Sequence, residues 1–236
     1  MKKILSLIIL LSFVSIFSQN GASNCEGAEP SCSDENGVKI FPNVTGSPDG
    51  GTIGCLGQTP NQAWFFIKID QTGSLEFDII QNSSFDVDGN PNGTDLDVDF
   101  IAWGPFRTAE NNCSSLEYNA GIGQSNTSES GVLNNYYIDN QDMSNVIDCS
   151  YSSRFIETFR IPNANAGDYY VLLVTNFSNA DGFIKLVQTN FGEAGAGVTD
   201  CTIVVGELGL DQDVCVGTDV ELDATPTTGT VDTYEW

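Results

Sequence analysis

Short runs of aromatic and β-branched residues, separated by turn-forming residues, are the feature that most constrains the fold of this chain. Some runs alternate apolar and polar residues, whereas the run at 169–174 is apolar throughout, as in a strand buried on both faces. No stretch after residue 18 keeps a helical period for three turns. The pattern predicts an all-β fold, an antiparallel β-sandwich, with strands at 63–69, 75–79, 155–159, 169–174 and 183–187.

The N-terminus has the composition of a secretory signal peptide. Residues 1–3 are a short basic start, and residues 4–17 form an apolar run that is too short to anchor in a bilayer. Cleavage after Ser18 would leave Gln19 at the mature N-terminus. We therefore expect a chain that engages the secretion machinery and has no integral membrane segment.

The charge balance excludes some partners. With 8 Lys and Arg against 32 Asp and Glu, the formal charge is −24, and loss of Lys2 and Lys3 with the signal peptide makes it −26. A field of this sign repels phosphate backbones, so we expect no nucleic-acid partner, whereas divalent cations are attracted. A generally acidic surface without a specific partner is the alternative.

Histidine is absent from the chain, which bears on catalysis. Without it, Ser-His-Asp and Cys-His nucleophilic sites and histidine-bound metals are excluded within this sequence. Chemistry by paired carboxylates stays open, but the acids are so abundant that no pair stands out. We therefore expect no enzyme activity within this chain.

The cysteines predict a disulfide framework. Seven follow the signal peptide, at Cys25, Cys32, Cys55, Cys113, Cys149, Cys201 and Cys215. In an oxidising compartment the six before residue 203 should form three bridges, for which fifteen connectivities exist. We predict a Cys113–Cys149 bridge, which would restrain the Asn- and Ser-rich segment 107–150.

A second domain is expected to begin near residue 204. The segment 204–236 holds two strand-like runs and Cys215, which is too little to close a sandwich. The expected organisation is a signal peptide at 1–18, a β-sandwich at 19–203, and a truncated second β-sandwich domain at 204–236. We expect this last segment not to fold by itself, and the sequence to be part of a longer protein.

An acidic segment between residues 86 and 99 is the candidate metal site. In the run 95–100, strict alternation places three aspartates on one face of a strand, about 7 Å apart, where they repel one another unless a cation lies between them. The loop before it departs from the EF-hand pattern, because Pro91 stands where that pattern has glycine. A solvated acidic face is the alternative. The predicted calcium ligands are Asp86, Asp88, Asp95, Asp97 and Asp99.

Four further residues complete the sequence-based hypotheses. Asn176 and Asp181 lie in a turn that could supply additional donors to the calcium site. Trp64 and Trp103 could stack on a bound sugar, but strand-like apolar residues flank both. We therefore predict that the two tryptophans belong to the core.

Five motifs in order give the chain a resemblance to exported proteins of gliding, Bacteroidetes-type bacteria. They extend over about residues 22–203, and the tail from Gly209 resembles the opening of a PKD-like or immunoglobulin-like repeat. The motifs are Gly54-Cys55-Leu56 with residues 60–65, the stretch 97–106, Asp148-Cys149-Ser150-Tyr151, Ile161-Pro162-Asn163-Ala164, and the stretch 169–178.

The resemblance implies a place and a role. Proteins of this kind are large, multi-domain, adhesin-like or gliding-motility-associated surface proteins, often exported by type IX secretion, with an N-terminal jelly-roll, CUB-like or pre-peptidase-like β-sandwich. It implies a secreted or cell-surface location outside the outer membrane. We expect a non-catalytic module for adhesion or domain display, with a surface glycan or protein as ligand. The alternative is an accessory domain of a secreted multi-domain hydrolase.

Overall fold

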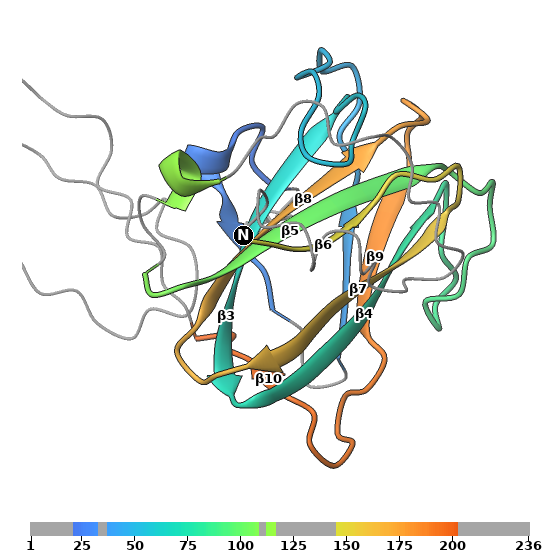
Figure 1. Ribbon diagram of the computed structural model, residues 1–236. Coiled ribbons are helices and arrows are strands. Elements are labelled where there is room, and N and C mark those ends of the chain that lie inside the picture. Colours follow the sequence, from blue (N-terminus) through green and yellow to red (C-terminus); the bar gives the residue numbers. More distant parts are fainter. Residues whose placement is uncertain (1–20, 33–36, 109–111, 117–144, 203–236) are drawn as a thin grey trace, which may run out of the picture.

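Two β-sheets pack face to face in the computed structural model, which describes residues 21–32, 37–108, 112–116 and 145–202 (Figure 1). The predicted β-sandwich is therefore confirmed. Within these ranges the helical elements are two 3₁₀ turns, η1 (Cys25–Gly27) and η2 (Asn112–Ser115), and no helix is long and apolar enough to span a membrane. The expected signal peptide, the segment 204–236 and Cys215 lie outside the described residues.

The larger sheet contains six of the described strands, and β8 lies at its centre. All neighbours are antiparallel except β1, which runs parallel to β3. In spatial order the strands are β1 (Glu29–Pro30), β3 (Gln62–Gln71), β8 (Tyr169–Asn176), β5 (Val98–Phe106) and β6 (Val146–Ser150), and β10 (Val198–Thr199) also pairs with β3.

The smaller sheet contains four described strands, all antiparallel, in the order β2 (Val38–Pro42), β9 (Phe183–Gln188), β4 (Gly73–Asn82) and β7 (Ile156–Ala164). The predicted runs lie in or overlap β3, β4, β7, β8 and β9. The sequence did not predict β1, β2, β6 or β10, and β6 falls within the segment 107–150 for which no strand was expected.

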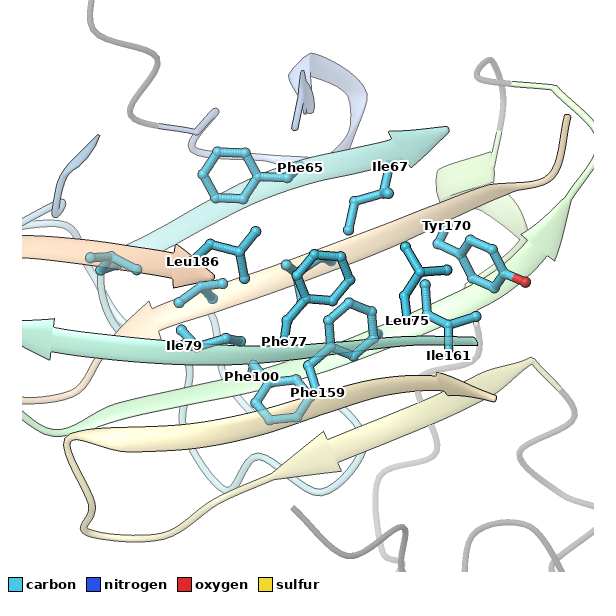
Figure 2. Close-up of a cluster of buried hydrophobic side chains, with 14 of the residues drawn as sticks. Phe65, Ile67, Leu75, Phe77, Ile79, Phe100, Phe159, Ile161, Tyr170 and Leu186 are labelled. Carbon is cyan, nitrogen blue, oxygen red and sulfur yellow. The ribbon is translucent and has the colours of Figure 1, made fainter. Parts of the chain in front are cut away.

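The main core lies between the two sheets and is rich in phenylalanine. Figure 2 shows Phe77, Phe100 and Phe159 meeting there, from β4, β5 and β7. The rings of Phe77 and Phe159 stack with centroids 5.5 Å apart, and Phe100 meets Phe159 edge-on at 5.8 Å. All three side chains are fully buried, and each burial contributes roughly 1.5–3 kcal/mol to folding.

A second apolar cluster covers the opposite face of the larger sheet. Trp64 on β3 and Trp103 on β5 stack 5.7 Å apart, and their exposed fractions are 3% and 0%. Ile53 and Leu56, from the loop before β3, and Leu116, after η2, pack onto this face. The core assignment of both tryptophans is confirmed, and the central strand β8 is buried on both faces, as its apolar run predicts.

Three disulfides hold this covering layer and the segments that enter and leave the sandwich. They confirm that the six cysteines before residue 203 pair completely. The bridges are Cys25–Cys113, Cys32–Cys201 and Cys55–Cys149, with Cα–Cα distances of 5.7, 5.3 and 6.3 Å.

The predicted Cys113–Cys149 bridge is wrong. Cys149 lies on β6 and packs into the covered face of the larger sheet, where Cys55 meets it. Cys113 lies in η2, beside Cys25 of η1. Cys149 therefore ties the covering loop with Cys55 to the sheet, and Cys113 ties one covering turn to the other. Neither bridge joins Cys113 to Cys149.

Removing the bridge between the cover and β6 should destabilise the domain strongly. For Cys55→Ala combined with Cys149→Ala we expect a loss of roughly 2–5 kcal/mol in the free energy of unfolding. Urea unfolding can be followed by tryptophan fluorescence, since Trp64 and Trp103 belong to the same cluster. An unfolding curve equal to that of the wild type would contradict this role. As a control, alkylation of the wild type without reductant should label none of the six cysteines.

Candidate functional site

A pocket of about 200 Å³ opens where β5 begins, between the strand and two neighbouring loops. It contains two carboxylates, two aromatic rings and two serines. Its lining residues are Asp97, Asp99, Tyr151, Ser152, Ser153 and Phe177.

Backbone pairing fixes the position of both aspartates. Asp99 lies in β5, opposite Thr175 of β8, and Asp97 immediately precedes the strand. The Phe177 N–H donates to the carbonyl oxygen of Asp97 at 3.1 Å, and the Asp97 N–H donates to Ser178 Oγ at 2.6 Å. The turn after β8 is therefore bound to the start of β5 and brings an aromatic wall to the pocket.

Asp99 is a buried acid, 1% exposed. Its Oδ1 accepts a hydrogen bond from the Ser152 N–H at 2.9 Å. Burial raises the pKa of Asp99 to about 8, and repulsion from Asp97 adds to this shift. Near neutral pH the folded protein therefore holds a proton on this side chain unless another cation replaces it.

Asp97 is half-buried, and its two oxygens differ in surroundings. Its Oδ1 is buried and has no hydrogen-bond donor among the described residues. Burial raises the pKa of Asp97 to about 6. A carboxylate oxygen buried without a donor costs free energy, and a cation bound to Asp97 would offset that cost.

Two more buried acids lie behind the pocket, where β6 and β7 approach each other. Glu157 on β7 is 2% exposed and accepts a short hydrogen bond from the Ser152 hydroxyl. Asp148 on β6 is 5% exposed, and its Oδ2 accepts from the Arg160 N–H of β7 at 2.8 Å. Burial raises the pKa of Asp148 to about 7, and it also raises the pKa of Glu157.

The sequence analysis missed both Asp148 and Glu157 as site residues. A signal for Glu157 was present, because alternation places it on the same strand face as the core residue Phe159. An acid at a core-facing position of a strand indicates a buried carboxylate. For Asp148 no local pattern gives such a signal.

The structure separates the five predicted calcium ligands. Asp86 Oδ1 accepts from the N–H groups of Asp88 and Asn90 at 2.9 and 2.8 Å, which closes a turn and lowers the pKa of Asp86. Asp88 is exposed, and Asp95 accepts from Asn82 Nδ2 at 2.9 Å. Only Asp97 and Asp99, of the five, line the pocket. In the described ranges no three Asp, Glu, His or Cys side chains are arranged to hold a metal ion.

The turn after β8, expected to supply extra donors, lies beside the pocket. However, the residues predicted as donors, Asn176 and Asp181, do not line it. Asn176 is fully buried, where it accepts from Gln81 Nε2 at 2.6 Å. Asp181 accepts from the Thr45 hydroxyl at 3.1 Å. Both residues hold loops together, and Phe177 takes part in the pocket instead.

Chemically, the pocket can bind a positive charge. Two carboxylates share it, and each is less stable in its charged form than an ordinary aspartate. Tyr151 and Phe177, whose rings meet edge-on at 5.7 Å, line it with aromatic surface. A proton, a metal ion or an organic cation would each relieve the buried charge.

Comparisons with known proteins identify no family. A scan against family models finds no match, and a search of curated proteins finds no significant one. Among solved structures, the chain is similar to CorA, described as a surface-associated copper-binding protein important in copper acquisition by Methylomicrobium album BG8. The TM-score is 0.33 at 11% identity, over 68% of this chain and 96% of that one. We draw no functional conclusion from a likeness this loose.

Stability should fall as pH rises. The pKa values of about 6, 8 and 7 for Asp97, Asp99 and Asp148 exceed the ordinary value of about 4, so the folded state binds more protons than the unfolded state between about pH 4 and 8. Asp99→Asn keeps the acceptor for Ser152 without the charge. In chelator at pH 8, we expect it to raise the free energy of unfolding by more than about 1.4 kcal/mol, which is one pKa unit.

Urea unfolding at pH 4, 6 and 8 measures this effect, and the wild-type and Asp99→Asn values should converge near pH 4. The matched control is Asp86→Asn, which removes the same charge from an exposed turn and should give no gain at pH 8. A wild-type free energy of unfolding that does not change with pH would contradict the buried acids described here.

Proposed function

We propose that this domain is a non-catalytic, exported surface module for adhesion or domain display, and that calcium bound at Asp97 and Asp99 stabilises it. One observation supports this proposal above the others. The pocket at the start of β5 brings together two carboxylates that burial makes unstable in their charged form, and one oxygen has no donor among the described residues.

Export is supported by the disulfides. Three bridges join six cysteines in the described part of the chain, and such bridges persist in oxidising compartments. The resemblance of residues 22–203 to exported surface proteins of Bacteroidetes-type bacteria points to the same place. The apolar run at residues 4–17 gives the chain a route to it.

Calcium fits the chemistry of the pocket better than magnesium. It takes six to eight oxygen ligands in a flexible arrangement, whereas magnesium requires near-ideal octahedral geometry and loses its waters reluctantly. Asp97 and Asp99 would supply carboxylate oxygens, and Ser152 and Ser153 line the same pocket. The remaining coordination positions would be open to water, or to hydroxyl or carboxylate oxygens of a surface glycan or protein.

Calcium should raise the stability of the wild type through this pocket. At free calcium a hundred times its dissociation constant, binding to the folded state alone adds about 2.7 kcal/mol. Melting temperatures should be compared in chelator, in millimolar calcium and in millimolar magnesium. Asp97→Asn combined with Asp99→Asn should abolish the calcium effect, and magnesium should do less in the wild type.

The matched control is Asp86→Asn combined with Asp88→Asn. This variant removes the same two charges from the turn outside the pocket, so calcium should still stabilise it as much as the wild type. An equal rise in all three proteins would mean general screening of a highly negative chain. No rise in any of them would mean that the acidic pocket is simply solvated or protonated.

Adhesion should depend on the same residues. Binding of the labelled domain to arrays of immobilised glycans and surface proteins should require calcium and be lost in the Asp97→Asn, Asp99→Asn variant. Asp86→Asn with Asp88→Asn again serves as the control and should bind as the wild type does. Binding that chelator and the pocket variant leave unchanged would place the ligand elsewhere on the domain.

A further inference from the structure

We propose that the Cys32–Cys201 disulfide is a mechanical clamp, which carries tension between the chain entering the domain and the chain leaving it. With the bridge closed, the residues between these two cysteines lie outside the loaded path and stay folded under load. This inference concerns the chain ends and does not depend on the pocket or on calcium.

The geometry of β3 brings the two ends together. β1 runs parallel to β3 beside Phe65 and Phe66, and β10 runs antiparallel beside Ile69 and Gln71, on the same strand. The two short strands therefore run toward each other. Cys32 follows β1 and Cys201 follows β10, so the bridge joins their facing ends across a sequence separation of 169 residues.

Noncovalent contacts alone hold β10 weakly. The strand has two residues and an irregular register, so its hydrogen bonds would break one after another when the chain after Cys201 is pulled. Next to it, the Asp200 N–H donates to the carbonyl of Lys68 at 2.8 Å, and their side chains form an ion pair of 2.8 Å. A partly exposed ion pair adds little resistance. The disulfide replaces this weak attachment by a covalent link.

The other two bridges do not give this protection. Cys25–Cys113 joins the entering chain to η2, and Cys55–Cys149 joins two internal segments. Neither includes the exit of the chain. If the clamp were absent, the shortest covalent path would run along the chain from Cys32 to Cys55, across Cys55–Cys149, and along the chain from Cys149 to Cys201.

Solvent access also distinguishes the clamp from the innermost bridge. Cys201 is exposed, whereas Cys55 and Cys149 are buried. A small dithiol such as dithiothreitol should therefore reduce Cys32–Cys201 before Cys55–Cys149. One thiolate attacks a sulfur of the bridge and displaces the other cysteine as a thiolate. The second thiol of the reagent then releases the first cysteine and leaves the reagent as its own disulfide.

Single-molecule pulling on the oxidised chain from residue 19 to 236, held by a tag at each end, tests the clamp. In Cys32→Ser with Cys201→Ser, the chain from residue 32 to 55 and from residue 149 to 201, about 75 residues in all, enters the loaded path and should lengthen the molecule by roughly 250 Å. The wild type should not release this length. The matched control, Cys25→Ser with Cys113→Ser, keeps the clamp and should behave as the wild type does.

Release of the same length from the oxidised wild type or from the control would overturn the proposal, as would no release from the clamp variant. A second measurement uses the wild type alone, so it does not depend on the folding of a variant. At constant force, the first lengthening step after dithiothreitol is added should be roughly 250 Å, because the clamp opens while the buried Cys55–Cys149 bridge holds. A first step of a different size would also overturn the proposal.

Discussion

The larger sheet is apolar on both faces, and the rest of the structure follows from that constraint. One face packs on the smaller sheet, so the other, with Trp64 and Trp103, needs a cover of its own. The cover consists of loops and 3₁₀ turns, which lack the continuous hydrogen-bond ladder of a third sheet. Disulfides supply the missing constraint, since Cys55 ties the cover to β6 and Cys25 ties its two turns together. The bridges therefore stabilise a cover that hydrogen bonds alone would hold less firmly, and bridges of this kind persist in oxidising compartments.

The same packing explains why acids are buried along one side. The edge strands β6 and β7 belong to different sheets and do not pair by a ladder, so the N–H of Arg160 needs another acceptor. The carboxylate of Asp148 provides it from the opposite sheet. An inward-pointing acid also blocks the pairing of a foreign strand at this edge. Burial raises the free energy of these acids in their charged form, and protonation, or a positive charge in the neighbouring pocket, would lower it.

Hydrophobic patterns within short stretches of sequence predicted the longer strands. Alternating or continuous apolar runs identified β3, β4, β8 and β9, and the alternation from residue 95 to 100 put Asp97 and Asp99 on one face of the strand, where both line the pocket. The strands β1 and β10, of two residues each, have no period of their own and exist because β3 offers an edge. The disulfide pairing was equally non-local. Asp86 and Asp88 lie outside the pocket because the Asp86 side chain accepts hydrogen bonds from backbone N–H groups of its own turn. The spacing of the acids in the sequence does not reveal these hydrogen bonds.

Covalent and electrostatic constraints act on different parts of this domain. The disulfides fix the cover and the segments that enter and leave the sandwich, whereas the buried acids lie along β5, β6 and β7, where their charge depends on protonation. Because the bridges do not titrate, they can hold the architecture while the pocket changes its charge. A change of charge at Asp99 then alters local stability without requiring the sandwich to open. The net charge of −24 means that surface acids repel one another throughout the chain. The bridges hold the fold against that general repulsion, whereas protonation of the buried acids acts only at the pocket and beside it.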